Sequence, residues 1–438
     1  MIKYTICLCF IVIAFVFAAC SKNEPIAQVP DGKKIYIPEE LKTMDFTNSS
    51  SNWSYKRMAT SENIVVFWEP GFGADPSTTS SKAMRFDVND LLKKSEKIYT
   101  YYRDSLKFVD KGSLLDTYRL MVMVKYQTEW LATGAGYDNK VGALWVNPST
   151  MQPVGDVIAH ELGHCFQYQV ACDGHYGFRD QNYVGSFWEQ CAQYMSRQVY
   201  PESVQSDIKM FVDNSYRNFS NEEIRYESYF LQEYWKAKHG KDFLGKLWKE
   251  ANVPEHPLQA YMRINNITQE QLNDEIGEYA MHNIIWDYPQ GPYMRSAASR
   301  VQAIHKTQFN AAGGVEIYEV AASQAPECYG YNAFRLTLPA VSTQVSVSFK
   351  GLAGSFPELS GWRYGFVGVK VDGKSAQYGH LGKTQNGEVA FTVTNDTNEL
   401  WFVVSGAPKT HWNHVWGTEA SKIPKFPYQV KFVNTKPM

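Results

Sequence analysis

The chain has 438 residues, of which 44% are hydrophobic and 15% aromatic, enough to build the cores of two or three domains. The formal net charge is -2, and no cluster of basic residues of the kind that contacts nucleic acid stands out in the sequence. Composition therefore excludes a largely disordered chain and argues against nucleic acid as a partner.

The first 20 residues have the pattern of a secretory signal peptide. A single lysine, Lys3, precedes the apolar run Ile6–Phe17, which is too short for a transmembrane helix. The tripeptide Ala18-Ala19-Cys20 resembles a bacterial lipobox. This resemblance implies that Cys20 becomes the lipidated first residue and anchors the protein to the outer membrane; cleavage as an ordinary signal peptide nearby is the alternative.

Residues 21–51 are polar and rich in turn-forming residues, as expected of a tether between a membrane and a folded domain. We therefore expect a protein of the cell envelope, periplasmic or surface-facing, whose folded part begins near residue 52.

Between Trp53 and Thr150 the pattern mixes strands with one long helix. Short apolar runs bounded by polar residues predict buried strands, and one longer segment has apolar residues at helical spacing. The expected strands are Ile64–Trp68, Tyr118–Tyr126 and Val141–Val146, and the expected helix is Val88–Phe108.

The segment His160–His164 has the form H-E-x-x-H. Residues four apart share one face of a helix, so both imidazoles can hold one metal ion while Glu161 reaches a water beside it. Pro153 is expected in the first helical turn, and Gly163 indicates a close approach of neighbouring backbone. Apolar residues at helical spacing predict the opposite, packed face: Val154, Ile158, Leu162, Cys165 and Phe166. The motif indicates a zinc site; a chance match on an ordinary helix is the alternative.

A zinc site that keeps one position open for water needs a third protein ligand. Residues 185–195 have the pattern of a second helix, in which Glu189 is the only acid. A carboxylate among Phe187, Trp188 and Cys191 is costly to bury unless it is paired or coordinated. Glu189 is thus the predicted third ligand; an exposed glutamate on the polar side of an amphipathic helix is the alternative.

The form H-E-x-G-H, a spacer of 24 residues and a glutamate together resemble the gluzincin metallopeptidases, in particular their enhancin-like, mucin-degrading branch. The run from Trp188 to Ala192 is similar to the third-ligand helix of many gluzincins. The resemblance implies zinc as the cofactor, held by His160, His164 and Glu189, with Glu161 as the catalytic base. Gln193 departs from the pattern, since some gluzincins carry there an Asp that orients a ligand histidine.

The resemblance has two further implications. Gluzincins place a sheet before the active-site helix, and an edge strand of that sheet binds extended peptide; Val141–Val146 is the expected edge. They often place a Tyr or His from a later helix against the oxyanion, which makes Tyr226 a candidate catalytic residue beside Tyr229. Packing in the core is the alternative for each tyrosine.

Four cysteines lie outside the first 20 residues, and two of them neighbour predicted ligands. Cys165 and Cys191 either form a disulfide in an oxidising envelope or stay buried as free thiols. Between the two ligand helices, Val170–Ser186 is expected to be a loop over the site. In that loop, His175 and Tyr176 either touch substrate or are solvated.

Beyond Pro201, the chain is expected to be helical and then to form a β-sandwich. The predicted helices are Val204–Val212, Tyr226–Lys238, Phe243–Glu250 and Gln269–Ile284. From about Gly313 the period changes to two, with strands expected at 345–349, 367–371, 389–393, 401–405 and 428–433. His411 and His414 have a spacing that would suit a second metal, but no third ligand is in view.

These patterns predict an α+β multidomain protein. A zincin-like (gluzincin), mostly helical catalytic domain with an N-terminal mixed sheet is expected at residues 52–312, followed by an antiparallel β-sandwich at residues 313–438. The predicted function is that of a lipid-anchored, monomeric zinc metallopeptidase acting on a protein or glycoprotein substrate. The alternative is a catalytically inactive or glycan-binding surface lipoprotein on the same scaffold. Since the metal signature lies before residue 313, the chemistry and the sandwich are expected to be separable.

Overall fold

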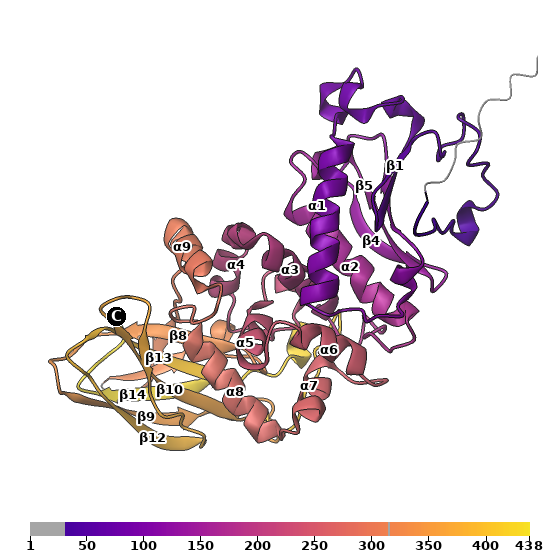
Figure 1. Cartoon of the computed structure of the whole chain (residues 1–438). Helices are drawn as coiled ribbons and strands as arrows, with labels where there is room; N and C mark the ends of the chain where they lie inside the picture. Colours follow the sequence, from indigo (N-terminus) through magenta and orange to yellow (C-terminus); the bar gives the residue numbers. More distant parts are fainter. Residues whose placement is uncertain (1–30, 314–315) are drawn as a thin grey trace, which may run out of the picture.

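The computed structural model describes residues 31–313 and 316–438. The predicted signal peptide, Cys20 and residues 21–30 lie outside this range. The described chain is a mixed α+β structure with several sheets: an N-terminal sheet with two long helices, a group of helices in the middle, and two further sheets at the opposite end (Figure 1).

Residues 31–51, predicted to be part of a tether, pack against the N-terminal sheet. Lys34 forms a parallel bridge with Tyr118, and Arg119 donates a 3.0 Å hydrogen bond to the carbonyl oxygen of Asp31. Phe46 is buried and its ring packs edge-on against Phe67. Because a buried ring and paired backbone stabilise this arrangement, the stretch belongs to the folded part of the chain.

The N-terminal sheet has five strands in the order β1-β2-β3-β5-β4. The three central strands run parallel, and the two outer strands pair antiparallel to them. The three predicted strands form, because their apolar runs fill the buried centre of the sheet; two have the predicted bounds, and the one predicted at Tyr118–Tyr126 is shorter. The strands are β1 (Met58–Thr60), β2 (Ile64–Trp68), β3 (Leu120–Val124), β4 (Ala132–Tyr137) and β5 (Val141–Val146).

The prediction that Val141–Val146 forms the edge of this sheet is wrong. The hairpin strand β4 lies outside β5 and forms the edge of the sheet beside the helix with the metal motif. Asp138 and Asn139, both at φ 52°, turn the chain between the two strands. The segment Ala-Thr-Gly-Ala-Gly-Tyr of β4 carries two glycines and no large alternating apolar residues, so no strand was predicted there.

The helix with the metal motif is α2 (Asp156–Cys172), which packs against β4, β5 and α3 (Phe187–Val199). Gly163 allows the contact with α3, since a Cβ at that position would lie 3.2 Å from Cα of Ala192. Gly134 of β4 allows the contact on the other side, because a Cβ there would lie 2.4 Å from the carbonyl oxygen of Glu161. The close approach predicted from Gly163 is confirmed.

Pro153 lies before α2 and not in its first turn, so that prediction is wrong. Met151 and Val154 form a β-bridge, which places Pro153 in a turn, and the helix begins at Asp156. The predicted helix Val88–Phe108 forms as α1 (Val88–Thr100), continued by a π-helical turn, η5 (Tyr101–Ser105).

The middle of the chain forms six α-helices among the described residues: α4 (Ile208–Asp213), α5 (Phe230–His239), α6 (Phe243–Glu250), α7 (Pro257–Asn265), α8 (Gln269–His282) and α9 (Gly291–Val301). Helix α6 has the predicted bounds. Helix α5 begins four residues later than predicted, which leaves Tyr226 in the turn before it. Helices α7 and α9 were not predicted.

The last part of the described chain forms two antiparallel sheets that pack face to face. One contains β11 (Ala376–Tyr378), β10 (Trp362–Lys370), β13 (Thr397–Gly406) and β8 (Tyr331–Leu336). The other contains β12 (Asn386–Thr392), β9 (Gln344–Gly351), β14 (Tyr428–Val433), β7 (Ile317–Val320) and β6 (Phe309–Ala311). Burial alternates along β9, as the period of two predicted. Helix α8 packs on β10 and β13, so those strands are buried on both faces.

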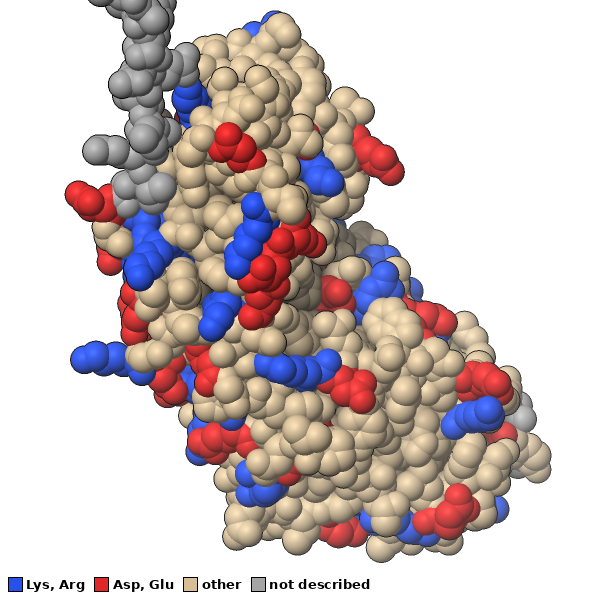
Figure 2. Space-filling view, turned by 90° about the vertical axis from the view of Figure 1, so that its right-hand side faces the viewer, with Lys and Arg blue, Asp and Glu red and all other residues tan. Residues whose placement is uncertain are grey.

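The surface agrees with the small net charge. On the face drawn in Figure 2, basic and acidic side chains are interspersed. Within residues 31–313 and 316–438, no helix has the length and apolar character that crossing a membrane requires.

The tight contact between α2 and α3 makes Gly163 a test of the packing. Gly163→Val should lower the free energy of unfolding by about 1–3 kcal/mol, because the added atoms meet the backbone of Ala192. Urea denaturation measures the change. Gly163→Ala is the control and should change the free energy of unfolding little. Its added methyl group makes one tight contact, but alanine favours the helix by about 1 kcal/mol over glycine. A Val variant as stable as the wild type would show that the two helices can separate at little cost.

Candidate metal centre

Helices α2 and α3 bring three metal-ligand side chains together. His160 and His164 lie one turn apart on α2, and Glu189 lies in the first turn of α3. The Nε2 atoms of the two histidines are 3.1 Å apart, and Oε2 of Glu189 lies 3.2 Å from the first and 3.3 Å from the second. Within the described residues, this is the one group of three such side chains whose ligand atoms lie close enough together to hold one ion.

The donor set fits zinc. Ligand atoms about 2.0–2.1 Å from a tetrahedral zinc ion are about 3.3 Å from one another. The three separations here, 3.1–3.3 Å, have that size. Two imidazole nitrogens and a carboxylate oxygen, with room for a fourth ligand, are the set found in catalytic zinc sites.

Gln193 orients His160. The Nδ1–H group of His160 donates to Oε1 of Gln193 at 2.9 Å, and Nε2 of Gln193 donates to Oδ1 of Asp207 at 3.2 Å. Asp207 also accepts hydrogen bonds from Arg197, at 2.7 Å, and from the Tyr229 hydroxyl, at 3.0 Å. A carboxylate thus acts on this histidine through an amide, which leaves the Nε2 lone pair of His160 directed at the other ligands.

Gln167 orients His164 in the same way. The Nδ1–H group of His164 donates to Oε1 of Gln167 at 2.8 Å, and Nε2 of Gln167 donates to the carbonyl oxygen of Trp188 at 2.8 Å. Gln167 therefore also ties α2 to α3. Sequence reasoning missed Gln167, although a polar residue three positions after a ligand histidine faces it on a helix. It also missed Asp207, which no local pattern marks.

Glu189 is held as an anion. Burial raises the pKa of its carboxyl group, but the hydrogen bonds and charges of His160 and His164 outweigh burial, so the pKa lies well below its ordinary value. Burial lowers the pKa of His164, but Glu189, Glu161 and Gln167 together outweigh burial, so the net shift is upward. A carboxylate held as an anion beside two imidazoles favours a metal ion in the same place.

Glu161 and Tyr226 border the same cleft as the ligands. The cleft has a volume of about 450 Å³ and is lined by residues 132–136 of β4 together with His160, Glu161, His164, Trp188, Glu189 and Tyr226. A second cavity of about 350 Å³ shares His160, Glu161 and Tyr226 and extends to Trp130, which is 61% exposed. The ring centroid of Tyr226 lies 5.8 Å from that of His160. The structure thus brings all five predicted site residues to one cleft.

Other residues that the sequence singled out lie elsewhere. Tyr176 packs against Phe178. Nε2 of His414 lies 2.6 Å from Oε2 of Glu222, with which it forms a hydrogen bond, and among the described residues His414 belongs to no group of metal-ligand side chains. Cys165 and Cys191 are buried free thiols, the second of the two predicted alternatives, and Cys191 accepts a 3.1 Å hydrogen bond from Trp248.

The fold and the site define an α+β protein with a two-histidine, one-glutamate group suited to a metal ion. A family profile described as "Family of unknown function (DUF6055)" matches residues 27–438, and the chain belongs to this family. A search of curated proteins found no match.

Several solved structures share limited similarity with the chain. The M60 catalytic domain of Clostridium perfringens ZmpC is 10% identical, with 83% of this chain and 68% of that chain covered and a TM-score of 0.30. The C-terminal family 22 carbohydrate-binding module of Clostridium thermocellum Xyn10B is 10% identical, with 30% and 82% covered and a TM-score of 0.20. The xylan-binding domain of Paenibacillus barcinonensis Xyn10C is 12% identical, with 30% and 80% covered and a TM-score of 0.19. Scores this low do not establish a common fold.

Removing any ligand tests the composition of the site. His160→Ala, His164→Ala and Glu189→Ala should each abolish stable zinc binding, because each variant keeps only two of the three protein donors. Metal analysis after dialysis against zinc provides the measurement. Full zinc occupancy in Glu189→Ala would show that another residue supplies the third ligand.

Gln193→Leu tests the orienting network. The variant should bind zinc about 10–100-fold more weakly than the wild type, because His160 loses the acceptor that fixes its ring. Competition with a chelator of known affinity measures the change. Gln198→Leu is the matched control, since Gln198 is buried on the same helix and bonds to Glu233 and not to a ligand. Equal zinc affinity in both variants would contradict an orienting role for Gln193.

Proposed function

We propose that this chain is a gluzincin-type zinc metallopeptidase that hydrolyses peptide bonds of proteins or glycoproteins. The observation that carries the proposal is the convergence of three ligand atoms, 3.1–3.3 Å apart, beside Glu161. These residues line a cleft that is bordered by the edge strand β4. A cleft with a metal-ligand set, an acid–base group and a strand edge contains the parts that peptide hydrolysis needs.

The chemistry divides between two carboxylates. Zinc bound by His160, His164 and Glu189 would acidify water and polarise the scissile carbonyl group. Because Glu189 faces the two histidines, Glu161 is the carboxylate free to act as general base. The Glu161 carboxylate accepts a proton from the attacking water and passes it to the leaving amine.

Tyr226 is the residue that we propose stabilises the developing charge. Its side chain is 37% exposed and borders both cavities, and its ring centroid lies 5.8 Å from that of His160. A phenol hydroxyl in this position donates a hydrogen bond to the oxyanion of the tetrahedral intermediate. The turn before α5 therefore supplies a second catalytic residue.

The substrate chain binds along β4. A peptide in extended conformation can pair with the free edge of this strand, and residues 132–136 of β4 all border the cleft. The two cavities meet at His160, Glu161 and Tyr226, so space for substrate extends to both sides of the catalytic residues. This arrangement supports cleavage within a chain.

The location of the enzyme rests on the sequence of residues 1–20. A lipid on Cys20 would hold the protein, as a monomer, at the outer membrane, within reach of periplasmic or extracellular proteins. Labelling cells with a radioactive fatty acid, comparing the wild type with Cys20→Ala, tests this assignment.

Glu161→Gln separates catalysis from metal binding. The variant should keep one zinc ion and its fold, because Gln preserves the shape of the side chain, and should lose hydrolysis by a factor of about 100 or more. Zinc analysis and cleavage of unfolded protein substrates and peptide libraries provide the two measurements. A wild type that binds zinc without cleaving any substrate would favour the catalytically inactive or glycan-binding alternative. Cleavage by Glu161→Gln at the wild-type rate would exclude Glu161 as the base.

A further inference from the structure

A short segment of the C-terminal β-region reaches back to the loop between the two ligand helices. This segment, residues 411–417, lies between β13 and β14 and is called the C-terminal clamp below. Asn413 donates a side-chain hydrogen bond to the carbonyl oxygen of Tyr183, and the amide of Trp416 donates to the carbonyl oxygen of Asn182 at 3.1 Å. Tyr183 and Asn182 directly follow Gln181, which lines the metal cleft.

The C-terminal clamp also holds the segment that leads to Tyr226. His414 is 1% exposed, and its Nε2 atom lies 2.6 Å from Oε2 of Glu222; the amide of Gly417 donates to Oε1 at 3.0 Å. Burial raises the pKa of Glu222, but the bonds from His414 and Gly417 help to outweigh burial, so the pKa lies below its ordinary value. Glu222 begins the 3-10 helix η9 (Glu222–Ile224), which ends two residues before Tyr226.

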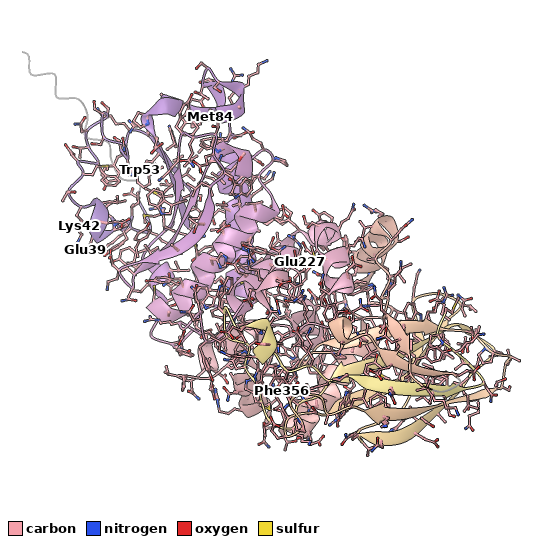
Figure 3. All side chains as sticks on the ribbon, turned by 180° about the vertical axis from the view of Figure 1, so that it is seen from behind. Glu39, Lys42, Trp53, Met84, Glu227 and Phe356 are labelled. Atoms are coloured by element: carbon pink, nitrogen blue, oxygen red, sulfur yellow. The ribbon has the colours of Figure 1, made fainter. Side chains whose placement is uncertain are left out.

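A stack of side chains connects the C-terminal clamp with the cleft. The guanidinium group of Arg225 lies 4.8 Å from the ring centroid of Tyr226 and 5.8 Å from that of Trp416. Both distances are in the range of cation–π attraction. Figure 3 labels Glu227, the residue after Tyr226, in the middle of the molecule, between the N-terminal sheet and the β-sandwich. The stack thus lies where the two halves of the chain meet.

The fit of the C-terminal clamp against the N-terminal half is close. Gly185 has φ +60°, and a Cβ at this position would lie 2.7 Å from the carbonyl oxygen of His414. Gly185 lies two residues before α3, the helix that carries Glu189. The clamp therefore contacts both segments that flank the cleft on this side: the loop before α3 and the turn with Tyr226.

We propose that the C-terminal clamp positions Tyr226 over the metal cleft, and that Trp416 and Arg225 are positioning residues of the active site. The catalytic consequence rests on the proposed peptidase function, but the mechanical coupling does not. Without Trp416, the Arg225 side chain loses one face of its stack, and the turn that carries Tyr226 loses a fixed neighbour. The C-terminal region is then part of the active site, contrary to the separability expected from the sequence.

Hydrogen exchange of the full-length, zinc-loaded protein tests the coupling without a substrate. Trp416→Ala should increase amide exchange in residues 181–185 and 222–229 and leave strands β9 and β12 and the zinc content unchanged. Trp416 is 46% exposed, so the variant is expected to fold, and its melting temperature checks this. Tyr293→Ala, which removes a 49% exposed aromatic ring on α9, is the matched control. Unchanged exchange in residues 222–229 of Trp416→Ala overturns the proposal.

Kinetics test the catalytic consequence on any substrate that the wild type cleaves. Trp416→Ala should lower kcat about 10-fold, because a hydroxyl that is held less firmly stabilises the oxyanion less. Tyr226→Phe removes this hydroxyl and should lower kcat further. The double variant Trp416→Ala/Tyr226→Phe should have the same kcat as Tyr226→Phe alone, and Trp416→Phe, which keeps an aromatic ring, should have most of the wild-type activity. Full activity of Trp416→Ala overturns the proposal and leaves the peptidase function intact. An inert wild type with the predicted change in exchange refutes the peptidase function and leaves the coupling intact.

Discussion

The close approach of α2 to its two neighbours is the constraint on which the site depends. Gly163 lets the backbone of α3 come near, and Gly134 lets β4 lie against the carbonyl group of Glu161. The first contact places Glu189 within 3.3 Å of both histidine nitrogens, and the second places the strand edge beside them. A branched side chain at either glycine would meet the backbone of the facing element and push it away from α2. Glycine at position 163 makes the helix about 1 kcal/mol less favourable than alanine would, but the close contact with α3 requires it.

Orientation of the ligands comes from a buried polar network. Asp207 and Arg197 are both buried, and such a pair stabilises the fold little, since burial of two charges costs free energy. Its effect is specific: Asp207 accepts bonds from Gln193, Arg197 and Tyr229, which fixes the amide that holds His160. An amide in this place holds the imidazole ring in one orientation without adding a charge next to it. This chain thus lacks the direct aspartate contact that some gluzincins have at the position of Gln193, and a carboxylate, that of Asp207, still ends the network.

The sequence predicted what depends on local spacing. Helical spacing predicted the two helices that carry His160, His164 and Glu189. Apolar runs predicted the three strands at the centre of the N-terminal sheet, and the period of two predicted the alternation in β9. The edge strand β4 was missed because its glycines serve contacts with α2 and not the sheet. Tyr226 was placed in a helix, although it lies in a turn fixed by Glu222. Asp207 and the C-terminal clamp were missed because contacts between distant segments leave no periodic signal.

The C-terminal clamp can act on Tyr226 only if the β-sandwich that carries it is held firmly against the helices. Buried polar contacts provide that attachment. Arg363, 3% exposed on β10, forms an ion pair of 2.6 Å with Asp274 of α8. The amide of Asn218 donates to the buried Glu327 at 2.7 Å, and its side chain donates to the carbonyl oxygen of Cys328 at 2.9 Å. If the sheets moved away from the helices, these buried groups would lose their hydrogen bonds in a low-dielectric environment. Motion of the sandwich relative to the helices therefore costs free energy. A loop on a freely moving domain would not fix a phenol ring over a metal site, whereas a loop on this attached sandwich can.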